Sequence, residues 1–184
     1  ILGGDELPVD HLGIDICVTG SQKCLAAPPG LAILSISGRA KKYMIDHPPP
    51  YQYFNLPRCF KYADERGETP FTPAIPLYYA LDEALAMILE EGLANRIQRH
   101  RICAKAFYSG LKAMGLEASS KEDVRSNTVL AFRYPNGIDD KQFRRTLDER
   151  YDVLVAGGFG ELRGKVFRIG SMGIVNGQHV LTTI

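Results

Sequence analysis

The sequence predicts an α/β protein whose carboxyl part is a small α+β domain. Two short apolar runs rich in β-branched residues lie near the amino end, and turn residues bound both of them. A long helical pattern occupies the middle of the chain, and strand signals then alternate with a helix signal. With 184 residues, the chain has the length of one ordinary domain or two small ones.

The first part is predicted to contain two buried strands, at residues 14–19 and 31–36. Residues 20–30 between them are predicted to form a turn, because glycines bound this segment and two adjacent prolines lie within it. A short helix is predicted over residues 39–45.

A proline-dense stretch follows, and it holds seven of the eleven prolines between residues 48 and 76. Proline fixes φ and removes a hydrogen-bond donor, so neither a central strand nor a long helix is expected here. Six aromatic residues lie among the prolines. They favour an ordered loop with a functional or interface role over the alternative, a disordered linker.

Residues 76–115 carry a helical pattern of leucines at three- and four-residue steps. Gly92 is expected to bend or break this helix, and we expect the domain boundary there, with a large-domain portion at 1–91 and a small domain at 92–184. Just beyond lie four basic residues that we expect to form a solvated helix face: Arg96, Arg99, Arg101 and Lys105.

The small domain is predicted to contain a β-α-β-β unit. Its strands are expected at residues 127–134, 153–156 and 165–170. Its helix is expected at residues 139–149, with either Asp139 or Asp140 as the capping residue.

Charge and cysteine content limit the function classes. Lys plus Arg number 22 and Asp plus Glu number 21, a balance that argues against a surface built for nucleic acid or an anionic membrane. No apolar run approaches the roughly 18 residues that span a bilayer. The four cysteines form no C-x-x-C pair, so no metal site is expected. We expect the cysteines to be reduced thiols in a cytoplasmic protein.

Both ends of the sequence are apolar, with Ile-Leu-Gly-Gly at the start and Val-Leu-Thr-Thr-Ile at the finish. Natural termini are usually polar and frayed. We therefore expect the chain to be a piece of a longer protein.

Lys23 is the first candidate for chemistry, because it follows a predicted strand directly in a turn of small residues. Ligands of open α/β sheets bind outside the carboxyl ends of strands. A partly desolvated lysine at such a place is a usable amine nucleophile. On the spacing alone, a plain surface lysine remains the more frequent interpretation of this pattern.

Three segments carry a resemblance to a known family. Residues 19–30 read Thr-Gly-Ser-Gln-Lys-Cys-Leu-Ala-Ala-Pro-Pro-Gly, residues 69–83 begin Thr-Pro-Phe-Thr-Pro-Ala-Ile-Pro, and residues 157–170 read Gly-Gly-Phe-Gly-Glu-Leu-Arg-Gly-Lys-Val-Phe-Arg-Ile-Gly. In order and spacing they resemble the class V (fold type I) pyridoxal-phosphate-dependent aminotransferases, in the serine–pyruvate and alanine–glyoxylate branch. The resemblance implies the end of the large cofactor-domain sheet, of aspartate-aminotransferase type, followed by most of the small domain.

The resemblance also implies roles for individual residues. Lys23 would bind pyridoxal phosphate covalently and shuttle a proton, and Gln22 would lie against the cofactor phosphate. Thr72 matches a threonine that reaches the phosphate of the neighbouring subunit, so a homodimer is implied. Thr69 stands where the branch often has a tyrosine, and this departure leaves its cofactor contact open. Arg168 matches the arginine that binds the substrate α-carboxylate, a task that suits a guanidinium fork.

The implied reaction is transamination between a small amino acid (alanine, serine or aspartate) and a 2-oxo acid (glyoxylate or pyruvate). The family's acid at the pyridine nitrogen, its ring-stacking aromatic residue and its phosphate loop precede the matched segments, so the chain alone is expected to be inactive. Two alternatives stay open. A desulfurase-like lyase would place His where Gln22 stands, and a non-catalytic assembly module would keep only the fold.

Overall fold

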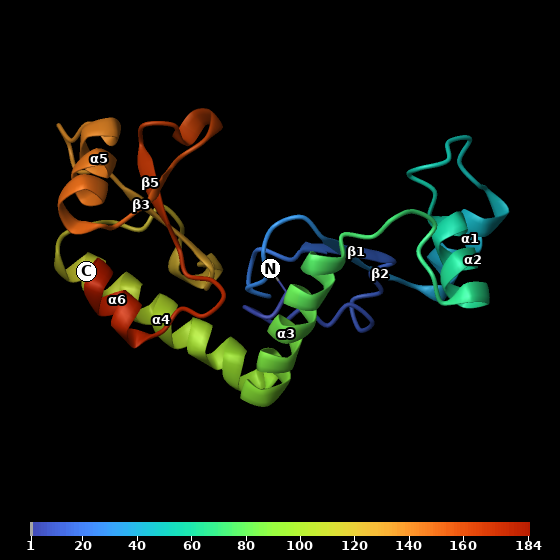
Figure 1. Cartoon of the computed structure of the whole chain (residues 1–184). Helices are drawn as coiled ribbons and strands as arrows, with labels where there is room; N and C mark the ends of the chain where they lie inside the picture. The colour runs from blue at the N-terminus through green and yellow to red at the C-terminus, as the bar shows by residue number, and fades with distance from the viewer. Residues whose placement is uncertain (1) are drawn as a thin grey trace.

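The computed structural model describes residues 2–184 and contains two separate sheets and a chain of helices (Figure 1). Its strands and helices, in chain order, are β1 (Ile16–Gly20), β2 (Ala32–Ile36), α1 (Gly38–Asp46), α2 (Leu56–Arg66), α3 (Ile75–Glu91), α4 (Leu93–Ala113), β3 (Val129–Arg133), α5 (Asp140–Tyr151), β4 (Ala156–Gly157), β5 (Val166–Gly170) and α6 (Gly177–Thr183). Two short 3-10 helices, η1 (Glu122–Val124) and η2 (Gly160–Leu162), complete the list.

The first sheet consists of β1 and β2, which pair antiparallel with Gly20 opposite Ala32. Both strands lie where the sequence predicts them, but the prediction that they are buried is wrong for this chain. Val18 is 61% exposed and Ile16 is 45% exposed. Alternating apolar residues favour an extended backbone, whereas burial needs a second layer, and the described residues leave this sheet with two strands only.

The proline-dense stretch contains a helix, so the prediction of an irregular loop throughout 48–76 is wrong. Helix α2 begins with Pro57 in its first turn, where the missing N–H is harmless, and the Asn55 side chain accepts from the Arg58 N–H at 2.9 Å. It ends at Gly67, whose φ of 63° is left-handed. The long proline-free interval after Pro57 is what permits this helix.

Helices α3 and α4 meet at Gly92, as predicted. This residue has φ 80° and ψ 129°, a conformation that interrupts the helix and favours glycine. Figure 1 shows the two helices meeting at an angle, with α4 running toward the second sheet. The expected solvated basic face is wrong for two of its members: Arg96 is 2% exposed, and the Arg99 side chain is only 25% exposed.

The second sheet, in the order β3-β5-β4, is antiparallel throughout and carries the main core. Phe107 and Leu111 of α4 pack with Phe132 of β3 and Phe167 of β5. Asp139 caps α5 by accepting from the Gln142 N–H at 2.8 Å, which decides between the two predicted caps. Strand β4 is shorter than predicted and lies later in the chain, because only Ala156 and Gly157 pair with β5, so that of the predicted residues 153–156 only the last belongs to the strand.

Helix α6 was not predicted, and it packs against α4. Its cap is a reciprocal pair, in which Asn176 accepts from the helix backbone while its own N–H donates to His179 Nδ1 at 3.2 Å.

The molecule is open rather than compact. Helices α1 and α2 stand apart from the second sheet, with the first sheet and α3 between them (Figure 1). The exposed surface is 12,646 Å², whereas a compact protein of 20.4 kDa exposes about 8,800 Å². Much of the excess is apolar, including Tyr53 and Phe54, which are 66% and 81% exposed. No helix among residues 2–184 is long and apolar enough to cross a membrane.

Candidate active site

The lysine turn, residues 21–31, links β1 to β2 and is organised by Ser21. The Ser21 hydroxyl is fully buried; it donates to the Pro28 carbonyl at 2.6 Å and accepts from the Leu31 N–H at 3.3 Å. The Ser21 N–H donates to the Leu31 carbonyl at 3.1 Å, so the ladder continues past the end of β1. A small hydroxyl residue before the lysine therefore closes the turn from inside.

Lys23 lies at the outer edge of this turn and is exposed. Its carbonyl accepts from the Ala26 N–H at 2.9 Å, and Ala26 has a left-handed φ of 63°. Within the described residues its amine has no hydrogen-bond or ion-pair partner. Gln22 beside it is also exposed, and its Oε1 lies close over Gly20. The backbone thus fixes the turn while the lysine amine stays available.

Arg168 lies at the middle of β5, between Ala131 of β3 and Ala156 of β4. Its Nε donates to the Gly157 carbonyl at 2.8 Å, and its guanidinium lies 3.8 Å from the centre of the Phe159 ring. These two contacts hold one edge and one face of the guanidinium. Within the described residues, its two terminal amino groups have no hydrogen-bond partner, and together they form a fork that fits a carboxylate.

The Gly157 carbonyl is itself supported from α5. Asp140 accepts from the Tyr134 hydroxyl at 2.6 Å and from Arg144 Nε at 2.9 Å, and a side chain at Gly157 would contact this pair at 3.4 Å. Hydrogen bonds from Arg144 and then Tyr134 lower the pKa of Asp140 to about 2. Burial and the Asp140 carboxylate raise the pKa of Tyr134, so its hydroxyl stays protonated.

The lysine turn and the strand of Arg168 belong to different sheets, and the loop after β5 connects them. A Cβ atom at Gly173 would lie 3.1 Å from the Ala26 Cβ and 3.7 Å from the Lys23 carbonyl oxygen. The lysine turn therefore packs against the loop that begins where the strand of Arg168 ends. Sequence reasoning missed Phe159, although its place inside the Gly-Gly-Phe-Gly run marked the segment.

Thr69 and Thr72 lie elsewhere, in the connection between α2 and α3. Both are exposed, and the Thr69 hydroxyl donates to the Phe71 carbonyl at 2.7 Å. Within residues 2–184, no hydrogen bond joins either threonine to the lysine turn. The structure therefore places the lysine turn against the loop that follows the strand of Arg168, and it leaves the two threonines outside this contact.

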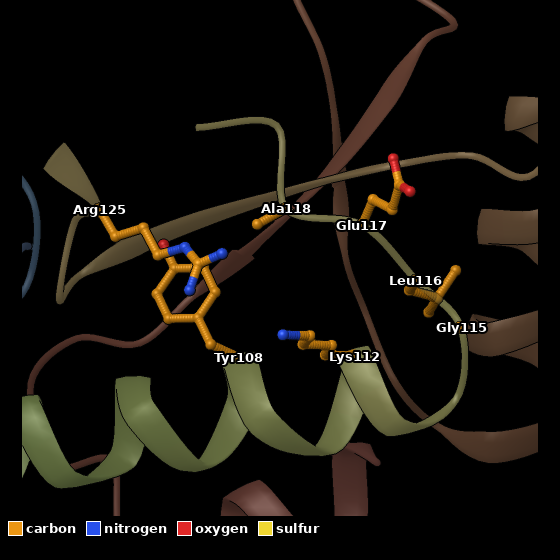
Figure 2. A pocket seen from close by; sticks show the side chains of 7 residues that line it. All are labelled: Tyr108, Lys112, Gly115, Leu116, Glu117, Ala118 and Arg125. Carbon is orange, nitrogen blue, oxygen red and sulfur yellow. The ribbon is translucent and has the colours of Figure 1, made fainter. Parts of the chain in front are cut away.

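A separate groove of about 400 Å³ lies between α4 and the loop before β3, and it contains neither Lys23 nor Arg168. In Figure 2 the Arg125 guanidinium lies over the Tyr108 ring, 4.8 Å from its centre, and Lys112 reaches toward it, whereas the Glu117 carboxylate points away. The groove is open and basic, and it presents no paired acid and base.

Known proteins resemble this chain over most or all of its length. The family model for class-V aminotransferases matches residues 2–161. An uncharacterized aminotransferase of Methanocaldococcus jannaschii is 50% identical over 184 residues, which is all of this chain and 48% of that protein. A serine–glyoxylate aminotransferase of Arabidopsis thaliana is 37% identical over 177 residues, covering 96% of this chain and 44% of that protein.

Solved structures match as well. The crystal structure of an alanine–glyoxylate aminotransferase from Nostoc sp. superposes with a TM-score of 0.93 at 33% identity, covering all of this chain and 49% of that one. A cysteine desulfurase from Thermococcus onnurineus is more distant, with a TM-score of 0.72 at 19% identity, a likeness that shows the fold alone. The chain spans about half the length of the curated relatives it matches.

Proposed function

Because the chain belongs to the class-V aminotransferase family, we propose that it is the part of a pyridoxal-phosphate-dependent enzyme that carries the cofactor lysine and the substrate-carboxylate arginine. The reaction moves an amino group from a small amino acid to a 2-oxo acid. The observation that carries this proposal is the guanidinium of Arg168, which is held on one edge and one face while its fork is free.

The residues of the lysine turn fit the cofactor. Lys23 offers an exposed amine without a partner among the described residues, and the adjacent Gln22 and the hydroxyl of Thr72 offer neutral donors for a phosphate. Pyridoxal phosphate, when bound, supplies an electron sink for negative charge at the substrate Cα. Thr69 is the weakest member of this set, since its hydroxyl is already used within its own loop.

The roles of the chain's own residues follow from these positions. Arg168 binds the α-carboxylate through paired charge-assisted hydrogen bonds and so fixes the orientation of Cα. Lys23 would hold the cofactor, and its amine, once free, would act as the base that takes the proton from the substrate Cα. Two half-reactions then share one site, which predicts ping-pong kinetics.

Small substrates are favoured. The matched proteins include enzymes named for serine and glyoxylate and for alanine and glyoxylate. We propose alanine, serine or aspartate as the amino donor and glyoxylate or pyruvate as the acceptor. Arg168 recognises only the α-carboxylate that all of them share, so the choice of donor depends on other residues.

We further propose that each site is completed by a second copy of the chain, as a homodimer. Thr72 lies outside the lysine turn of its own chain, and a phosphate contact from it suits the neighbouring subunit. The aromatic residues Tyr51, Tyr53 and Phe54 are exposed beside it, and aromatic side chains are favoured at interfaces. The four free cysteines suit a reducing compartment, and we propose a cytoplasmic location.

The test is chemical labelling of Lys23 in the full-length natural protein. We expect borohydride reduction in the presence of pyridoxal phosphate to fix the cofactor on the peptide that contains Lys23, and Lys23→Ala to abolish this label. Lys42→Ala, on the exposed face of α1, is the matched control. A label on another lysine would refute the proposal.

The alternatives predict other outcomes. A desulfurase-like lyase would release sulfur from cysteine, yet Gln22 stands beside the lysine where those relatives place histidine. A panel of donors against glyoxylate and pyruvate, with cysteine included, separates the two activities. A non-catalytic assembly module would bind no cofactor at Lys23.

A further inference from the structure

A partly buried ionic cluster lies at the bend between α3 and α4, and neither the proposed chemistry nor the hydrophobic core uses it. Glu91, the last residue of α3, accepts from Arg99 Nε at 2.6 Å and from Arg99 Nη2 at 2.9 Å. The same carboxylate accepts from Arg96 Nη1 at 2.9 Å. One acidic side chain thus binds two arginines of the first turns of α4, directly across Gly92.

Terminal amino groups of both arginines also reach backbone carbonyls far away in the sequence. Arg96 Nη2 donates to the carbonyl of Cys24, the residue after Lys23, at 2.8 Å. Arg99 Nη2 donates to the Gly173 carbonyl at 3.1 Å, and Arg99 Nη1 donates to the Val175 carbonyl. The cluster therefore joins the lysine turn to the loop that follows the strand of Arg168.

The three charged side chains of the cluster are not explained by a gain in folding stability alone. The Arg96 side chain is 3% exposed, and those of Glu91 and Arg99 are 26% and 25% exposed. Burying three charges demands desolvation that their attraction roughly repays, so such groups are best explained by the geometry they impose. The Arg99 and Arg96 guanidiniums also keep the pKa of Glu91 below its ordinary value, so the cluster stays ionised at neutral pH.

The geometry imposed here joins the two proposed catalytic segments. The Lys23 carbonyl contacts the Gly173 region, and Arg168 lies on the strand that ends just before it. We propose that Glu91, Arg96 and Arg99 are positioning residues that set the spacing between the Lys23 amine and the Arg168 guanidinium. This inference rests on the proposed function, because the spacing matters only if one substrate meets both groups.

The experiment uses the full-length natural protein loaded with pyridoxal phosphate. In Arg99→Met the link from Glu91 to both carbonyls of the post-β5 loop is lost, and we expect kcat to fall about 10- to 100-fold because the proton transfer is misaligned. Donor KM should change less than about threefold, since Arg168 still binds the carboxylate. Arg99→Lys keeps the positive charge without the guanidinium fork, so its kcat should lie between those of the natural protein and Arg99→Met.

A second readout does not depend on turnover. In Arg99→Met, hydrogen exchange should become about tenfold faster than in the natural protein for the amides of residues 171–175, whose loop Arg99 holds. The amides of the lysine turn, residues 21–31, should follow, because Ala26 packs against Gly173. Arg101→Met is the matched control, because Arg101 lies on the same helix, is half-exposed and, among residues 2–184, forms ion pairs with Asp5 and Glu6 alone. It should leave kcat and the exchange of the turn unchanged.

The outcomes separate the inference from the function. A natural protein that binds no cofactor at Lys23 refutes the proposed function, and the exchange experiment then still reports whether the cluster holds the turn. A natural protein that transaminates while Arg99→Met keeps full kcat per loaded site and normal exchange overturns the inference. If Arg99→Met does not fold, Glu91→Gln and Arg99→Lys are measured instead, and each should show a smaller but measurable loss of kcat; an unchanged kcat in both overturns the inference.

Discussion

Replacing Arg168 by alanine removes the guanidinium fork and leaves the rest of β5 in place. Its Nε bond to the Gly157 carbonyl and its contact with Phe159 leave two terminal amino groups for the donor carboxylate. A hydrogen bond to a charged group contributes about 1.5–3 kcal/mol net. At about 1.4 kcal/mol per decade, donor binding should weaken roughly 10- to 150-fold.

The assay is a titration of the loaded full-length protein with amino donor, followed by the absorbance of the bound cofactor. Arg168→Lys should recover only part of the loss, because an ammonium cannot stack on Phe159 and bind both carboxylate oxygens at once. Arg133→Ala is the matched control, since Arg133 is an exposed arginine of the neighbouring strand β3. Pyridoxal phosphate itself should bind all of these variants equally well.

Two results would refute this reasoning. In the first, cofactor affinity collapses in Arg168→Ala while donor affinity survives, which would assign the arginine to the phosphate. In the second, Arg133→Ala weakens donor binding as much as Arg168→Ala does, which would mean that general charge rather than the fork attracts the donor.

Two further predictions concern the support of Arg168. Gly158→Ala should destabilise the protein by about 1–3 kcal/mol in urea unfolding, because its Cβ would lie 2.2 Å from the Leu162 carbonyl oxygen, whereas Gly177→Ala, with open space around it, should have little effect. The pKa of Asp140 is about 2 when folded, below its ordinary 3.8, so its stabilisation is complete above about pH 4 and is lost as pH falls toward 2. We expect this loss of stability to be up to about 2 kcal/mol in the natural protein and in the control Asp148→Asn, and to be absent in Asp140→Asn. Equal acid sensitivity of the natural protein and both variants would contradict the assignment.

The elements that local signals specify could be predicted from the sequence. The apolar runs around the lysine turn, the break at Gly92 and an aspartate cap at residue 139 or 140 each depend on a few adjacent residues, and the structure has all of them, with Asp139 as the cap. The position of Lys23 in the turn after a strand could likewise be predicted from adjacent residues. Helix α2 as a whole was not predicted, because seven prolines in one stretch concealed the proline-free interval within it.

What the sequence could not predict depends on distant partners. Arg96 and Arg99 have the spacing of a solvated face, and nothing local reveals that their carbonyl partners lie 72 and 74 residues away. The exposure of Val18 could not be predicted either, because an apolar β-branched run predicts a strand but does not show whether another layer covers the sheet. Phe159 was missed for the same reason, since its partner is an arginine on another strand.

Gly92 is the single residue between α3 and α4, so a small change of its backbone angles rotates the whole of α4. Helix α4 has 21 residues and is therefore about 31 Å long. A rotation of only about 5° at Gly92 would move the far end of this helix by about 3 Å, the full length of a hydrogen bond. The positions of the elements at the far end of α4 therefore depend on the backbone at Gly92. A substitution beside Gly92 can disturb chemistry that takes place far from it.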